Sequence, residues 1–260
     1  MYAFLWRPKW ILSHLLVLVL ISSMIAAMFW QISRLHEKQD ANALVARNSV
    51  QAPLSPDGFD AALQRSTMAR LQYRRVESVG SYDTSAEVEI QSRTLDGAPG
   101  RWIATPFVPA DGGTPILVVR GFVPLAVTDT TPPFDGAEPP AGQVTIVGWV
   151  QPTQTKGFFG STDASTGRLT AMARVDVARF SRQYGTVKPY WLQLSGQEPP
   201  TKRPLLSGVP LPEPDEGPHR GYAGQWAIFT AIAILGYPLV LRRAIKQHAI
   251  DGDDDDDDDA

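Results

Sequence analysis

The sequence predicts two transmembrane α-helices, one near each end of the chain, that bracket a β-rich α+β extracytoplasmic domain built as a small barrel or sandwich. Two apolar stretches without formal charges support the helices, Ile11–Ile32 and Gly221–Leu241. Each has about the twenty residues that an α-helix needs to cross the hydrocarbon core of a bilayer. The residues between them are too polar to enter a bilayer, and they contain short β-rich runs bounded by Gly and Pro.

The first apolar stretch is longer than the core of a secretory signal, which has roughly 7–15 apolar residues and ends in a small-residue cleavage site. Trp10 and Trp30 bound it, and twenty residues of helix place their indoles about 30 Å apart. Aromatic residues at both ends are typical of the two interfaces of a bilayer. A transmembrane helix is therefore favoured over a signal or a buried core helix.

Basic residues on the two tails predict how the helices are oriented. Arg7 and Lys9 precede the first apolar stretch, and Arg242, Arg243 and Lys246 follow the second. The positive-inside rule then places both tails in the cytoplasm and the domain outside. This orientation divides the chain into five parts: a cytoplasmic tail (1–10), transmembrane helix 1 (11–32), an extracytoplasmic β-rich domain (33–220), transmembrane helix 2 (221–241) and an acidic cytoplasmic tail (242–260).

Composition excludes several kinds of chemistry. The chain contains no cysteine, so disulfides, thiolate metal sites and cysteine nucleophiles are ruled out. The net charge of −3 includes eight aspartates within 251–259, so the rest of the chain is net positive. This acidic run is expected to be a solvated tail. The alternative is a calcium site, but a bare run of Asp lacks the loop geometry that arranges six to eight oxygen ligands.

Within the domain, segments with the apolar spacing of helices or of strands are separated by Gly and Pro residues, which interrupt both. We expect a linker over Asp40–Leu54, and then a helix from Pro56 to about Leu71 that Ser55 caps. Local patterns also predict four strands, at 86–90, 115–123, 143–150 and 188–194. They further predict a short helix at 175–184, a hairpin turn at 111–113 and an extended Pro-rich segment at 199–218.

The sequence contains no convincing catalytic motif. Gly157–Ser161 lacks the strand–turn–helix context of a phosphate loop or nucleophile elbow, and a turn is the simpler interpretation. Tyr73–Arg75 is a small basic cluster that is more typical of a solvated strand face than of a nucleic-acid patch. The chain is therefore expected not to be an enzyme. A periplasmic hydrolase on a membrane stalk would need a nucleophile paired with a base.

The four histidines are the remaining candidates for chemistry. His248 lies in the basic tail, and His14 lies near the inner end of the first span. His36 and His219 lie at the predicted outer ends of the two spans. An ionisable group at a membrane boundary is a functional candidate, and neutral imidazole can ligate haem iron. His219 is therefore either such a ligand or an interfacial anchor beside Arg220.

Several local patterns occur in an informative order along nearly the whole chain. They are Trp30-Gln31 with Arg34 and Lys38; Gly80-Ser81-Tyr82-Asp83 with Glu87-Val88 and Arg93; Thr105-Pro106-Phe107 and Asp111-Gly112; Val119-Arg120-Gly121-Phe122-Val123-Pro124; Pro189-Tyr190-Trp191-Leu192; and His219 with Tyr222-Ala223 and Gln225-Trp226. This succession resembles the surfeit locus protein 1 family. The family's usual Asn-Arg-Gly-Trp-Val-Pro block has Val119 and Phe122 in place of Asn and Trp here, and Pro218 stands where many members have Asn.

The resemblance implies a function in the bacterial inner (plasma) membrane. It implies a multi-pass, membrane-anchored assembly factor for haem-copper cytochrome c oxidase, which assists the delivery or insertion of haem a held transiently. His219 matches the family's proposed haem ligand, and the matching residues Tyr222, Gln225 and Trp226 could line its pocket. The implied partners are oxidase subunits and the lipid bilayer, with no nucleic acid. The alternative is a structural accessory subunit, bound to the oxidase or to a respiratory supercomplex without carrying haem.

Overall fold

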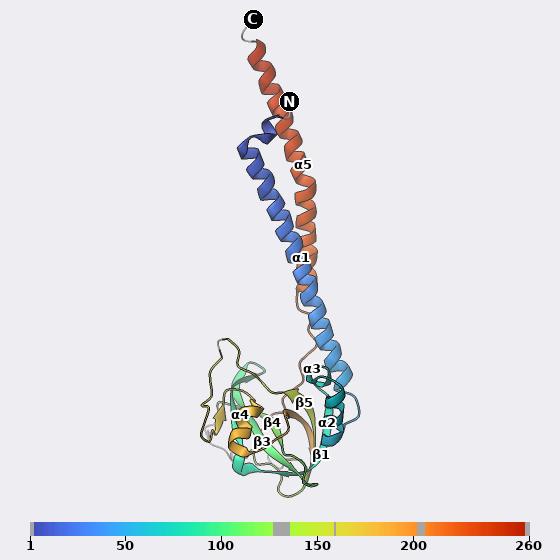
Figure 1. Ribbon diagram of the computed structural model, residues 1–260, viewed down its shortest axis with the longest axis vertical. Helices are drawn as coiled ribbons and strands as arrows, with labels where there is room; N and C mark the ends of the chain where they lie inside the picture. Colours follow the sequence, from blue (N-terminus) through green and yellow to red (C-terminus); the bar gives the residue numbers. More distant parts are fainter. Residues whose placement is uncertain (1–2, 127–135, 159, 202–205, 258–260) are drawn as a thin grey trace. The chain divides into compact units, whose positions relative to one another are not determined.

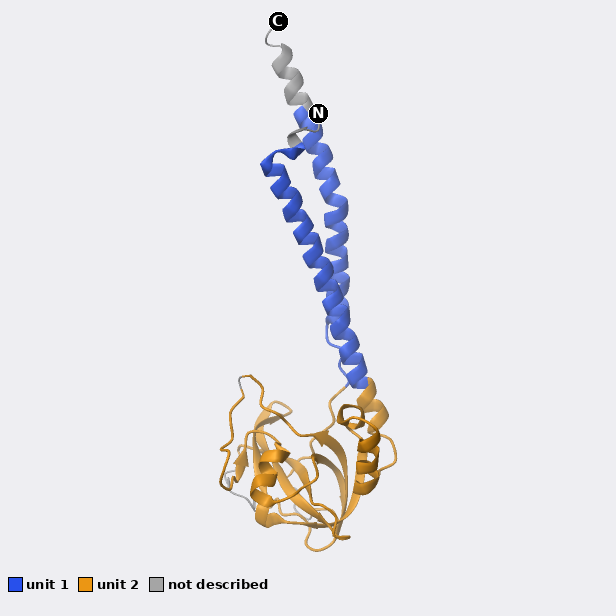
Figure 2. Ribbon diagram, viewed as in Figure 1, with its two compact units in different colours: residues 1–42, 214–260 blue, residues 43–213 orange. Residues whose placement is uncertain are grey.

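The chain divides into two compact units. In the computed structural model, which describes residues 3–126, 136–158, 160–201 and 206–257 (Figure 1), one unit comprises residues 1–42 and 214–260 and the other residues 43–213 (Figure 2). Two long helices account for most of the first unit, α1 (Pro8–Asn48) and α5 (His219–Asp257), preceded by a short 3-10 helix (Ala3–Trp6). The second unit is rich in β-sheet.

Both long helices are long enough and apolar enough to cross a membrane, by length and composition. Within the first unit they lie alongside one another (Figure 2). Large apolar side chains are exposed along both of them, for example Leu12, Leu16, Ile232 and Leu235. The two expected helices are therefore present, and each is longer than its apolar stretch.

The expected linker over residues 40–54 is wrong in its first half, because α1 continues without interruption to Asn48. Residues 41–47 are rich in Ala, Leu and Arg, which are strong helix formers, and no Gly or Pro occurs before Pro53. The helix ends where the Asn48 side chain donates hydrogen bonds of 2.8 Å to the carbonyls of Arg70 and Gln72. Local propensity therefore extends the helix into the second unit.

The described residues of the second unit form seven strands in one sheet. They are β1 (Arg75–Tyr82), β2 (Val88–Leu95), β3 (Ala98–Pro109), β4 (Ile116–Pro124), β5 (Val144–Pro152), β6 (Ala171–Met172) and β7 (Tyr190–Glu198). Their order is β1-β5-β7-β4-β3-β2-β6, and β1 also pairs with β3. The pairings of β1, β5, β7, β4 and β3 therefore form a closed circuit. In β1, Gly80 pairs both with Val144 of β5 and with Pro109 of β3.

Apolar residues are buried on both faces of this sheet. Successive residues of β4 over 116–119 alternate between two hydrophobic clusters, as the period of a strand requires. Phe180 of α4 (Val177–Tyr184) packs into one cluster, and Phe59 of α2 (Pro56–Arg65) packs into the other. Phe59 meets Tyr190 edge-to-face, with ring centroids 4.8 Å apart. The two short helices thus cover opposite faces of the same strands.

The helix expected from Pro56 to Leu71 divides into two. The Ser55 cap is confirmed, because its hydroxyl accepts a hydrogen bond from the Gly58 amide at 3.1 Å. However, α2 ends at Arg65 and a separate short helix, α3, covers Met68–Leu71. Ser66 is extended between them, with φ −147° and ψ −178°. Ser and Thr favour caps over helix interiors, and Ser66-Thr67 ends one helix and begins the next.

The expected strands at 115–123, 143–150 and 188–194 correspond to β4, β5 and β7, with shifted ends, and α4 lies within the expected 175–184. The strand expected at 86–90 begins later, at Val88, because a 3-10 turn, η2, covers Thr84–Ala86. The expected turn at 111–113 is present between β3 and β4, where Asp111 accepts a hydrogen bond from the Gly113 amide at 2.9 Å. The described parts of 199–218 contain no helix or named strand.

A row of side-chain amides crosses one side of the second unit. Gln72 donates to Gln151 at 2.9 Å, and Gln151 donates to Gln193 at 3.1 Å. Gln193 in turn donates to two successive carbonyls, those of Val209 at 2.8 Å and Pro210 at 3.0 Å. The Asn48 side chain holds the end of α1 against the chain just before β1. The row of amides holds the segment at Val209 and Pro210, from which the chain continues into the first unit.

Candidate functional site

The first unit brings one predicted site residue into contact with a polar partner from the other long helix. His219 begins α5, and its Nδ1 lies 2.8 Å from Oε1 of Gln31 in α1. Asp215 Oδ1 accepts a hydrogen bond of 2.7 Å from the Gly217 amide, which fixes the turn just before His219. The imidazole is half-buried between a polar turn and an apolar helix pair.

The contact with Gln31 determines what the imidazole can do. An amide oxygen accepts hydrogen bonds and does not donate them, so Nδ1 of His219 is the donor. In a neutral imidazole the lone pair is then on Nε2, the form that ligates a metal. Metal-binding histidines are commonly held in this way, by a second hydrogen bond that fixes the tautomer and the ring orientation. The Gln31–His219 pair therefore has the chemistry of an oriented imidazole that can ligate a metal.

Gly217 lies close to the Cδ2–Nε2 edge of the His219 ring. A Cβ at this position would lie 3.3 Å from Cδ2 and 3.4 Å from Nε2 of His219. Gly217 also has φ +63°, a conformation that a side chain disfavours. Gly217 therefore packs close to the Nε2 edge of the His219 ring, and a side chain there would crowd the imidazole.

The other three predicted site residues form an open surface and not a closed pocket. Tyr222 is 48% exposed and Gln225 is also exposed, whereas Trp226 is half-buried against Phe229, with ring centroids 6.1 Å apart. Among the described residues, no hydrogen bond joins Tyr222, Gln225 or Trp226 side chains to His219. The structure thus connects His219 to α1 and leaves the other three along α5.

The position of Gln31 at the outer end of the first apolar stretch predicts that it faces the His219 end of the second, and the contact between the two side chains confirms this packing. The sequence did not indicate that Gln31 would hydrogen-bond the imidazole itself. A multi-ligand metal site is not found here, because the described residues contain no group of three or more metal-ligating side chains.

In the second unit, the most buried polar cluster surrounds Arg120 of β4. Its guanidinium donates to Glu87 Oε2 at 2.5 Å, to Thr105 Oγ1 at 2.8 Å and to the Ala137 carbonyl at 2.7 Å. The Arg120 and Glu87 side chains are only 2% and 1% exposed. The guanidinium carbon lies 5.6 Å from the centre of the Tyr82 ring. This arrangement joins four segments and compensates the charge of Arg120 with a carboxylate.

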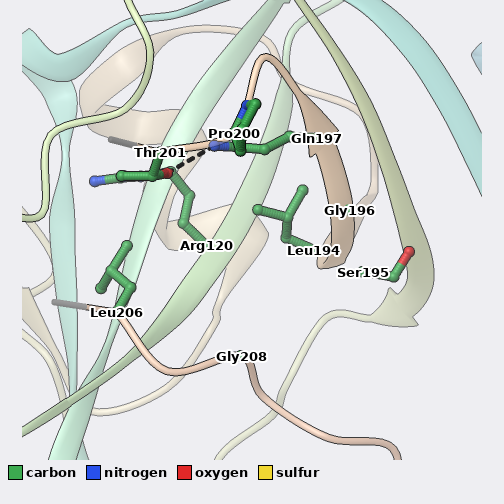
Figure 3. Close-up of a pocket in the computed structure, with 9 residues that line it drawn as sticks. All are labelled: Arg120, Leu194, Ser195, Gly196, Gln197, Pro200, Thr201, Leu206 and Gly208. Atoms are coloured by element: carbon green, nitrogen blue, oxygen red, sulfur yellow. Dashed lines mark hydrogen bonds between the residues drawn. The ribbon is translucent and has the colours of Figure 1, made fainter. Parts of the chain in front are cut away.

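A cavity of about 310 Å³ lies next to this cluster, between the end of β7 and the segment around Gly208 (Figure 3). Gln197 donates to Thr201 at 2.8 Å across its rim and accepts a hydrogen bond from the Tyr82 hydroxyl at 2.9 Å. Burial raises the pKa of Tyr82, and this effect is larger than the lowering of the pKa by the positive charge of Arg120. The Tyr82 hydroxyl therefore keeps its proton and remains a donor. With its charge already paired, Arg120 here acts as a structural cross-link.

Comparison with known proteins shows that Gln31, Arg120 and His219 all lie within the part of the chain that matches one protein family. The SURF1 family model matches residues 18–231, a range that includes Gln31, Arg120 and His219. Uncharacterized SURF1-like proteins of Mycobacterium tuberculosis and Mycobacterium bovis are 28% identical over 247 residues, which cover 90% of this chain and 84% of each relative. Surfeit locus protein 1 of Xenopus tropicalis is 31% identical over 172 residues, covering 56% of this chain and 52% of the relative.

Proposed function

The chain belongs to the SURF1 family, and from that membership we propose that it is a non-enzymatic, membrane-anchored assembly factor for haem-copper cytochrome c oxidase that assists the delivery or insertion of haem a. The family is known generally for cytochrome oxidase assembly. Two further features support the proposal. Two long apolar helices flank the domain in sequence, and the closed strand circuit is suited to a small, rigid barrel that contacts oxidase subunits.

The proposed location is a bacterial inner membrane, with α1 and α5 crossing it and the second unit outside. Basic residues at both chain ends support this orientation through the positive-inside rule. A polar helical stretch of α1, residues 33–48, follows the apolar part and would be about 24 Å long at 1.5 Å per residue.

Reporter fusions test this orientation. A reporter that is active only in the cytoplasm should be active when fused after Ala260, because both tails are expected on that side. The same reporter inserted at the exposed turn residue Gly112 should be inactive, whereas an export-dependent reporter should show the opposite pattern at the two positions. Activity of the export-dependent reporter after Ala260 would contradict the proposed arrangement.

His219 is proposed as the ligand of the haem a cargo. The observation that carries this proposal is the contact of its Nδ1 with Oε1 of Gln31, which orients the imidazole. Tyr222 and Trp226 add flat apolar surface on the same helix, and Gln225 adds an amide that can donate hydrogen bonds. A single neutral imidazole binds haem reversibly, which suits a protein that passes its cargo to another.

Substituting His219 and its partner tests the ligand role. His219→Ala should lower haem occupancy and oxidase maturation without changing expression or membrane insertion. Gln31→Leu should weaken binding by about 10–100-fold, the usual effect of losing the group that orients a histidine ligand. His36→Ala, which changes an exposed histidine of α1, is the matched control and should bind haem normally. The measurement is the haem-to-protein ratio of purified full-length variants co-expressed with haem a synthesis.

If His219→Ala retains the wild-type haem content, or if the wild type binds none, the ligand role is wrong. Stoichiometric co-purification with the oxidase in the absence of haem would then favour the structural accessory subunit. Deletion of the gene should also lower the haem a content of the oxidase, and an unchanged content would argue against an assembly role.

A further inference from the structure

A second cavity of the second unit lies beside the row of side-chain amides. Its volume is about 640 Å³, and its lining comes from β2, β3, β5 and β7 and from the extended segment 209–213. Two indoles line it, those of Trp102 and Trp191, with ring centroids 6.1 Å apart. Sites for ligands commonly have volumes of roughly 300–1,000 Å³ and combine aromatic side chains with a few oriented polar groups.

Hydrogen bonds to the backbone fix how the amides of this row are oriented. The carbonyls of Val209 and Pro210 can only accept, so the Gln193 atom that lies 2.8 Å and 3.0 Å from them is its nitrogen. Gln193 Oε1 then accepts from Gln151, and Gln151 Oε1 in turn accepts from Gln72. This succession ends at Gln72 Oε1, an acceptor without a hydrogen-bond donor among the described residues.

Gln154 provides the complementary group. Its Oε1 accepts from the backbone amide of Val175 and from the guanidinium of Arg93, both at 3.0 Å, so its orientation is fixed as well. The nitrogen Nε2 has no acceptor in the part of the chain that the structure describes. Gln154 and Gln72 are both half-buried and both line the cavity. The cavity therefore presents one fixed donor and one fixed acceptor, the two groups that a peptide unit of a polypeptide can satisfy.

The charges of the lining select for a positive ligand. Among the described residues, the charged ones that line the cavity are Asp96 and Glu213, and both are exposed. The indole of Trp102 already attracts one cation, because the guanidinium carbon of Arg93 lies 4.4 Å from the centre of its ring. Arg93 itself lines a different cavity. Two carboxylates beside aromatic faces are the surroundings that a lysine or arginine side chain prefers.

We propose that this cavity binds an extended segment of a partner polypeptide that carries a basic side chain. A main-chain carbonyl of the segment would accept from Gln154, a main-chain amide would donate to Gln72, and the basic group would pair with the carboxylates. Gln193 already binds main chain in this way, since it donates to two successive carbonyls of the protein's own extended segment. The inference adds a partner-binding surface and does not depend on the ligand role of His219.

The test is the binding of a labelled peptide to the purified full-length protein in detergent, measured by fluorescence anisotropy. The probe is a hexapeptide of alternating valine and lysine, blocked at both ends. The wild type should bind it saturably below about 1 mM. The same peptide with glutamate in place of lysine should bind at least about tenfold more weakly, because its charges would face Asp96 and Glu213. The acidic tail at 251–259 attracts any basic peptide, so binding at the cavity is the difference between variants.

Three variants locate the binding. Asp96→Asn combined with Glu213→Gln removes both charges at nearly unchanged shape and should weaken binding of the lysine peptide by about 3–10-fold. Gln72→Met removes the fixed acceptor and should weaken binding by about 3–10-fold, the usual effect of one hydrogen bond. Glu77→Gln is the matched control, because it neutralises an exposed carboxylate of the same unit outside the cavity, and it should bind as the wild type does. Unchanged melting temperatures show that the variants fold.

Several outcomes would overturn the proposal. Wild-type affinity in both cavity variants would assign the binding to the acidic tail or to another surface. Equal affinity for the lysine and glutamate peptides would exclude the basic specificity, and the absence of saturable binding would exclude the site. Binding of maltotriose that Gln72→Met weakens, without binding of the peptide, would make the cavity a sugar site. None of these results changes the haem-to-protein ratio that tests His219.

Discussion

Arg120→Met is expected to lower the free energy of unfolding of the second unit by about 3–5 kcal/mol, the usual cost of removing one partner from a buried ion pair. The substitution keeps most of the side-chain volume but leaves the Glu87 carboxylate buried without its guanidinium. Thr105 and the Ala137 carbonyl lose a donor at the same time. Denaturation of the full-length protein in detergent, followed by tryptophan fluorescence, measures the change.

Two further variants make the result interpretable. Adding Glu87→Leu to Arg120→Met removes the stranded charge and should recover much of the lost stability. Arg34→Met breaks the exposed pair between Arg34 and Glu37, whose side chains are 51% and 57% exposed, and should cost no more than about 0.5 kcal/mol. Wild-type stability of Arg120→Met would refute the structural role. A loss of oxidase maturation in that variant is expected to follow from the destabilised fold.

Gly80→Ala is expected to destabilise the second unit at or above the upper end of the usual overpacking cost of about 1–3 kcal/mol. A Cβ at Gly80 would lie 2.1 Å from the carbonyl oxygen of Val108 and 2.9 Å from Cα of Pro109. Both atoms belong to the backbone of β3, so the clash cannot be relieved by a side-chain rotation. The substitution would push β1 away from β3, at the pairing that closes the strand circuit.

Gly196→Ala is the matched control for this prediction, because Gly196 lies in a strand of the same sheet and a Cβ there would meet no atom within 4 Å. Its melting temperature should be close to that of the wild type. The same denaturation experiment serves both variants. Equal melting temperatures for Gly80→Ala and Gly196→Ala would show that the β1–β3 pairing contributes little to the stability of the unit.

Local patterns in the sequence were sufficient for the elements whose cause is local. The length and apolar composition of 11–32 and 221–241 determined two long helices, and Ser55 determined the start of α2. Runs of β-branched residues bounded by Gly and Pro located β4 and β5, and the aromatic and apolar run that follows Pro189 located β7. The same reasoning passed over β3, because its Pro99, Gly100 and Pro106 are residues that interrupt isolated strands.

The tertiary structure decided whatever depends on partners distant in sequence. β3 forms because β2 and β4 pair on its two sides, and the circuit closes because β1 also reaches it. The pairing of Gln31 with His219 joins residues 188 positions apart. The local spacing of residues cannot predict such a contact. The two side chains meet only because the two long helices pack together. The sequence alone determined which residue types were available for the site, and the packing of α1 against α5 determined which of them meet.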